Sequence, residues 1–152
     1  MSVGVGDSAP AFTLAGTGER TYSLADYTGQ PVVVVFYPGD DTPVCTKQLN
    51  TYNDELDQFT DLGAQVLAIS AQDVTSHERF STKHGGFAFP LLADPDKAVA
   101  ASYGTLGPLG FPRRSVFIVD GAGTIRYAHR AIAGLTYRSV DELVDVVRTL
   151  TA

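Results

Sequence analysis

The sequence is poor in cysteine, tryptophan and clustered positive charge. It has one cysteine and no tryptophan among its 152 residues, and its longest basic run is the pair Arg113 and Arg114. A lone cysteine cannot form a disulfide within the chain, which suits a reducing compartment, and we expect a cytoplasmic location. A nucleic-acid surface needs clustered Lys and Arg to neutralise phosphates, so we expect no nucleic-acid partner.

Long hydrophobic runs are also absent. No segment approaches the roughly 18 apolar residues of a membrane helix, and the opening residues lack the basic start and apolar run of a signal peptide. We therefore expect no membrane contact. Hydrophobic residues make up 44% of the chain, charged residues make up 18%, and the net charge is −6. Without a repeat or a Pro/Ser-rich linker, this length predicts a single domain over residues 1–152.

Hydrophobic runs predict several strands. Apolar and β-branched runs indicate strands at 32–37, 66–69, 115–119 and 125–128, the last two joined by a glycine-rich hairpin turn. Short segments at 11–15 and 21–23, around Gly16-Thr17-Gly18, predict an amino-terminal hairpin.

Helical spacing fills the stretches between these strands. One apolar face is expected from Val44 to a stop at Gly63, formed by Cys45, Leu49, Tyr52, Leu56 and Phe59. Further helices are expected at 76–84, 98–103 and 139–150. The first and last of these begin with the capping boxes Thr75/Glu78 and Ser139/Glu142. The pattern predicts an α/β sandwich of the thioredoxin-like kind, with a mixed central sheet flanked by helices, or else a small doubly wound fold.

The stretch Tyr37-Pro38-Gly39-Asp40-Asp41-Thr42-Pro43-Val44-Cys45 connects the strongest strand to a helix. Thr42 suits the N-cap and Pro43 the first helical position. A thiol in the first turn lies near unpaired N–H groups and the positive end of the helix dipole, which favour the thiolate. Against this, a lone cysteine on an apolar helix face is often an inert small hydrophobe, and apolar surroundings raise the pKa of a thiol.

Several motifs resemble those of peroxiredoxins, which are thiol-dependent peroxidases with a thioredoxin-like fold. Pro38, Thr42 and Cys45 match the pattern Pro-x-x-x-Thr/Ser-x-x-Cys. The phrase FYPGDDTPVCTKQL is similar to the Q-type (bacterioferritin-comigratory) or E-type alkyl hydroperoxide reductase branch. Further matches are the opening GDSAPAFTL, the segment LLAD and residues 114–120.

This resemblance implies a set of site residues. Cys45 is expected to attack hydrogen peroxide or an organic hydroperoxide, with Thr42 and Arg114 holding the peroxide and Pro38 shielding the thiolate. Arg113, next to Arg114, is expected to be exposed, although a shift of one residue would exchange them. For Gln48, a place on the solvated helix surface is expected slightly ahead of a place in the polar network of the site.

The sequence departs from the family pattern at Asn50, where many Q-type members carry a resolving cysteine. With Cys45 alone, the resemblance implies a one-cysteine mechanism and an external thiol reductant: thioredoxin, a glutaredoxin-like protein or a low-molecular-weight thiol. We expect a monomer or homodimer, and neither a cofactor nor a metal, because the three histidines lack ligand spacing. A non-enzymatic redox sensor remains the alternative. A disulfide reductase is disfavoured, since Thr42 occupies the first position of a Cys-x-x-Cys motif.

Overall fold

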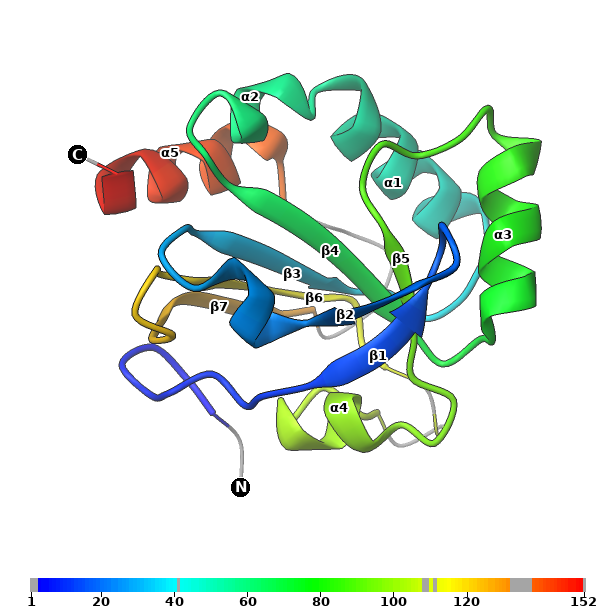
Figure 1. Cartoon of the computed structure of the whole chain (residues 1–152), viewed down its shortest axis with the longest axis horizontal. Helices are drawn as coiled ribbons and strands as arrows, with labels where there is room; N and C mark the ends of the chain where they lie inside the picture. The colour runs from blue at the N-terminus through cyan, green and yellow to red at the C-terminus, as the bar shows by residue number, and fades with distance from the viewer. Residues whose placement is uncertain (1–2, 41, 108–109, 111, 132–137, 152) are drawn as a thin grey trace.

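A seven-stranded mixed sheet lies at the centre of the chain, with strand order β2-β1-β5-β4-β3-β6-β7 (Figure 1). The computed structural model describes residues 3–40, 42–107, 110, 112–131 and 138–151. The strands are β1 (Thr13–Gly16), β2 (Arg20–Ser23), β3 (Val32–Phe36), β4 (Gln65–Ser70), β5 (Leu91–Ala93), β6 (Ser115–Val119) and β7 (Ile125–Arg130). The helices are the 3-10 helix η1 (Leu24–Tyr27), α1 (Pro43–Asp54), α2 (Asp57–Thr60), α3 (Val74–Lys83), α4 (Ala98–Ser102) and α5 (Val140–Thr151).

Strand β3 lies where the pairing in the sheet changes from parallel to antiparallel. It pairs in parallel with β4 and antiparallel with β6, so that Val34 faces Leu67 on one side and Phe117 on the other. All five residues of β3 are buried, because helices or loops cover both of its faces. This explains why its sequence is a continuous apolar run rather than an alternating one. The predicted thioredoxin-like fold with a mixed sheet is confirmed.

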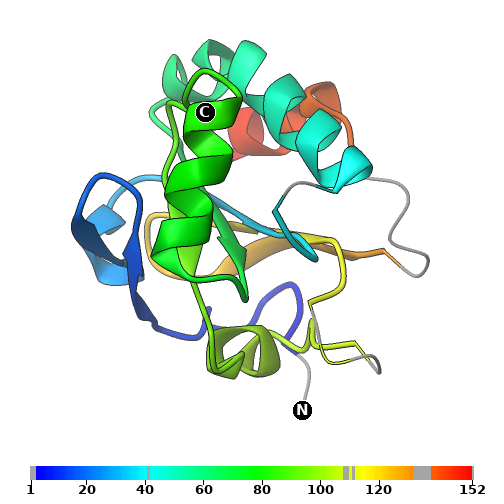
Figure 2. The ribbon, with the colours of Figure 1, turned by 90° about the vertical axis from the view of Figure 1, so that its right-hand side faces the viewer.

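Two apolar cores lie on opposite faces of this sheet. Leu49 of α1, Phe80 of α3 and Val144 of α5 belong to one core. Val99 of α4 and the amino-terminal Phe12 belong to the other. Figure 2 shows α1 and α5 on one side of the sheet and α4 on the opposite side. None of the helices in the described part of the chain is long and apolar enough to cross a membrane.

The single helix predicted from Val44 to Gly63 is wrong, because α1 and α2 are separate helices. Glu55 is the C-cap of α1, and its N–H is hydrogen-bonded to the carbonyls of Asn53 and Thr51. Phe59 on α2 is nevertheless fully buried in the same core as α1. The break preserves the phase of the apolar positions, so their spacing gave no sign of it.

The predicted capping box at the start of α3 is also wrong. Helix α3 begins at Val74, and the carboxylate of Asp73 caps it by accepting a hydrogen bond from the N–H of Ser76 at 2.8 Å. Glu78 instead accepts a hydrogen bond from the N–H of Gly18, in the turn between β1 and β2, at 3.1 Å.

At α5 the predicted capping box forms only in part. The hydroxyl of Ser139 accepts a hydrogen bond from the N–H of Glu142. The carboxylate of Glu142 pairs with Arg138, at 2.6 Å.

The three-residue strand β5 was not among the predicted elements.

Candidate active site

Cys45 lies in the first turn of α1, which follows the loop at the carboxyl end of the central strand β3. Thr42 is the N-cap of α1 and Pro43 opens the helix, as predicted. The side chain of Cys45 is fully buried. Its position is in the turn of the helix whose backbone N–H groups lack partners within the helix and carry partial positive charge.

Arg114 lies beside Cys45 because β6 is the neighbour of β3. Ser115 pairs with Phe36 at the end of β3, so the residue just before β6 reaches the start of α1. The Nη2 atom of Arg114 donates a hydrogen bond to Sγ of Cys45 at 3.1 Å, and only 3% of Arg114 is exposed. A buried guanidinium this close stabilises negative charge on the sulfur.

Gln48 is part of this site, which corrects the expectation of a solvated surface position. It is fully buried one turn after Cys45, and its Oε1 accepts a hydrogen bond from Nη1 of Arg114 at 2.6 Å. Its Nε2 donates to the hydroxyl of Tyr52 at 3.4 Å, and that hydroxyl donates to the carbonyl of Arg138 at 2.7 Å. The guanidinium is therefore held by two acceptors. The spacing Cys45, Gln48, Tyr52 on one helix face could have revealed this position.

The other predicted residues lie in or near the same loop. The hydroxyl of Thr42 donates to the carbonyl of Gly39 at 3.3 Å, and makes no side-chain capping bond to α1. Pro38 is half-buried at the start of this loop. Arg113 is half-buried rather than exposed, and its backbone N–H donates to the carbonyl of Thr105 at 2.7 Å. Of the two adjacent arginines, Arg114 is the one bonded to Cys45.

A second polar cluster adjoins the loop, and sequence reasoning missed it. Asp40 accepts hydrogen bonds from the hydroxyls of Tyr37 and Ser76, each at 2.7 Å, and its Oδ2 lies 2.8 Å from Nδ1 of His77. Burial acts to raise the pKa of Asp40, but the bonds from His77, Ser76 and Tyr37 hold it below its usual value. Burial, together with the nearby Asp40 carboxylate, raises the pKa of Tyr37 well above its usual value. His77 lies 37 residues from Asp40 in sequence, and no local pattern links them.

The comparisons with known proteins agree with this geometry. Residues 5–128 match the AhpC/TSA family. The chain belongs to this peroxiredoxin family. It is 38% identical over 129 residues to "Peroxiredoxin Q, chloroplastic" of Oryza sativa subsp. japonica, covering 84% of this chain and 59% of that protein. It is 36% identical over 126 residues to the protein of the same name from Populus jackii, covering 82% and 59%. The chain thus spans about three fifths of the length of these relatives.

Solved structures of peroxiredoxins have the same fold. "Mycobacterium bovis AhpC" superposes with a TM-score of 0.89 at 28% identity, covering 100% of this chain and 94% of that one. A 2-Cys peroxiredoxin of Plasmodium vivax superposes with a TM-score of 0.87 at 24% identity, covering 95% and 80%. This second likeness is one of fold alone.

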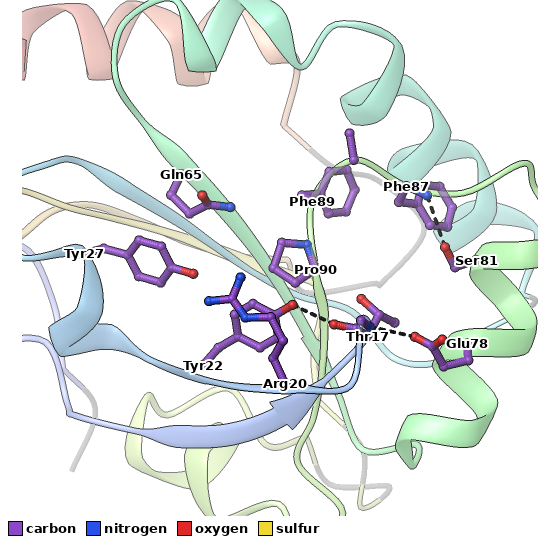
Figure 3. A pocket seen from close by; sticks show the side chains of 12 residues that line it. Thr17, Arg20, Tyr22, Tyr27, Gln65, Glu78, Ser81, Phe87, Phe89 and Pro90 are labelled. Carbon is purple, nitrogen blue, oxygen red and sulfur yellow. Dashed lines mark hydrogen bonds between the residues drawn. The ribbon is translucent and has the colours of Figure 1, made fainter.

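A polar cavity of about 410 Å³ lies elsewhere in this peroxiredoxin, between the β1–β2 hairpin, α3 and residues 87–90 (Figure 3). At the edge of the cavity, Arg20 stacks on the ring of Tyr22, and Glu78 and Phe87 also line the cavity. None of the four predicted site residues lines the cavity, which is therefore separate from Cys45. Among the residues that the structure describes, no group of three or more His, Cys, Asp or Glu side chains is arranged to hold a metal ion.

Proposed function

We propose that this peroxiredoxin is a thiol-dependent peroxidase that reduces hydrogen peroxide and organic hydroperoxides through Cys45. The thiolate attacks the terminal oxygen of the hydroperoxide, so that an S–O bond forms as the O–O bond breaks. The departing oxygen takes up a proton and leaves as water or an alcohol. The sulfur is oxidised to a sulfenic acid while the peroxide is reduced.

The contact between Nη2 of Arg114 and Sγ of Cys45, at 3.1 Å, carries the proposal. The guanidinium keeps its charge at every physiological pH and presents several fixed donors. It stabilises the thiolate before attack and the peroxide oxygens as charge moves onto them. The hydroxyl of Thr42 can exchange its 3.3 Å bond to the carbonyl of Gly39 for a bond to a peroxide oxygen. Pro38 shields the thiolate from solvent.

The sulfenic acid needs a thiol from outside the chain, because Cys45 is the only cysteine of the sequence. An external thiol attacks the sulfenic sulfur, which forms a mixed disulfide and releases water. A second thiol then attacks this disulfide and restores Cys45. Thioredoxin, a glutaredoxin-like protein or a low-molecular-weight thiol supplies these groups, in a reducing compartment such as the cytoplasm. The working unit is a monomer or homodimer.

Turnover separates this function from that of a redox sensor. With peroxide and excess dithiothreitol, the wild-type chain is expected to consume many equivalents of peroxide, whereas Cys45→Ser consumes none above the uncatalysed rate. Full turnover by Cys45→Ser would overturn the proposal. Oxidation of wild-type Cys45 without recycling by thioredoxin, a glutaredoxin or dithiothreitol would favour the sensor.

A further inference from the structure

The ring of His77 is fully buried between two hydrogen-bond acceptors. Nε2 lies 2.9 Å from the carbonyl oxygen of Leu92 on β5, and Nδ1 lies 2.8 Å from Oδ2 of Asp40. The Asp40 side chain is only 3% exposed. Water therefore has little access to either partner, and the hydrogen bonds within the cluster must satisfy them.

Counting protons defines the state of this pair. A carbonyl oxygen only accepts, so Nε2 carries a proton. The hydroxyl of Tyr37 uses its proton on Oδ1 of Asp40, and Ser76 donates to Oδ2. The 2.8 Å contact between Nδ1 and Oδ2 then also needs a proton, because otherwise a nitrogen lone pair would face a carboxylate. Since Asp40 accepts these other bonds as a carboxylate, the proton resides on His77, which is an imidazolium.

Asp40 transmits this interaction to the loop before Cys45. It lies between Pro38 and Thr42, and its backbone N–H donates to Oε1 of Gln72 at 3.1 Å. The hydroxyl of Ser70, at the end of β4, donates to the same oxygen at 2.6 Å. The side chain and the backbone of Asp40 are thus both hydrogen-bonded to residues outside the loop.

The charges around His77 are few. From the β3 end and the loop, Tyr37 and Asp40 face it, and β5 presents the Leu92 carbonyl. On its own helix, the carboxylate of Asp73 caps α3 and that of Glu78 is bonded to Gly18. From α1, the Cys45 thiol is near enough for its charge to act on Tyr37. Loss of the His77 proton would therefore leave the buried Asp40 carboxylate with hydrogen bonds from Tyr37 and Ser76 but without a positively charged partner.

We propose that His77 and Asp40 form a proton-dependent clamp that positions the loop segment from Pro38 to Asp40, which makes His77 a positioning residue for the reaction of Cys45. The clamp is closed while His77 holds both protons. When it loses one, repulsion at Asp40 displaces the loop, and the added negative charge disfavours the Cys45 thiolate. The consequence for peroxide reduction rests on the proposed function, but the effect on thiol reactivity does not.

The test compares pH profiles between pH 5 and 10 for two reactions of reduced Cys45: alkylation by iodoacetamide and oxidation by hydrogen peroxide. In the wild type, both rate constants are expected to rise as the thiolate forms and then to fall as His77 loses its proton. His77→Asn keeps an N–H donor toward Asp40 that does not titrate, so its profile is expected to lack the falling limb. The matched control His129→Asn, on β7, is expected to retain it.

NMR of the wild-type chain supplies a readout that needs no variant to fold. The ring resonances of His77 are expected to titrate at the pH where the alkylation rate falls. A wild-type profile without a falling limb, a limb that persists in His77→Asn, or a His77 titration at another pH would overturn the clamp. A falling limb in alkylation without any reaction with peroxide would refute the peroxidase and leave the clamp supported.

Discussion

Replacing Arg114 by lysine tests the part of the site that most directly acts on the sulfur. Arg114 donates one hydrogen bond to Sγ of Cys45 at 3.1 Å and another to Oε1 of Gln48 at 2.6 Å. Lysine keeps the positive charge but offers one nitrogen in place of the guanidinium fork. A hydrogen bond to a charged group contributes about 1.5–3 kcal/mol. Because about 1.4 kcal/mol corresponds to a factor of ten, Arg114→Lys should lower the rate constant for oxidation by about 10- to 150-fold.

The assay is rapid quenching of reduced protein with hydrogen peroxide at neutral pH, with the remaining Cys45 thiol measured by mass. Arg113→Lys is the matched control, since its neighbour Arg114 alone is bonded to the sulfur, and it should stay within about twofold of wild type. A slow Arg113→Lys beside an unaffected Arg114→Lys would refute the assignment. Equal unfolding curves for both variants exclude a general loss of structure.

Three further changes test the network and the core. Gln48→Glu places a carboxylate on Arg114, so the alkylation of Cys45 should require a higher pH than in wild type, with Gln48→Met as the uncharged comparison. Leu49→Ala removes a fully buried side chain and should cost about 2–5 kcal/mol in unfolding free energy, measured in urea. The lowered pKa of Asp40 means that its carboxylate stabilises the fold above its unfolded pKa, about 3.9, and loses this effect as pH falls through the folded value. Asp40→Asn should therefore cost roughly 3 kcal/mol near pH 6 and progressively less as the pH falls below about 3.9; a cost that does not change with pH would contradict this reasoning.

Strand and helix patterns predicted the architecture because burial leaves a direct mark on sequence. The run at 32–36 is apolar because both faces of β3 are covered, and the proline after Thr42 opens α1 as its backbone geometry favours. The break between α1 and α2 after Glu55 left no such mark. Phe59 falls on the same apolar face whether the segment is one helix or two. Strand β5 has three residues, too few for a periodic signal.

Motifs predicted the residues around the sulfur, whereas other contacts of the site join residues that are distant in sequence. Cys45 and Thr42 lie in one local segment, so their spacing was informative. The buried partners Gln48 and His77 were harder to recognise, because polar residues on helices are usually solvated. The family resemblance placed Arg114 in the site, but its bond to Gln48, 66 residues away, and the bond between His77 and Asp40, 37 residues apart, appear only in the folded chain.

The central claim is that Cys45 itself reduces peroxide, and the most direct measurement treats the reduced chain with one equivalent of hydrogen peroxide or an organic hydroperoxide. We predict that the Cys45 peptide gains one oxygen atom within the mixing time, that dimedone traps it as a sulfenic acid, and that an added thiol restores the original mass. The account would be contradicted if the Cys45 thiol stayed reduced and the peroxide stayed unconsumed with every hydroperoxide tested.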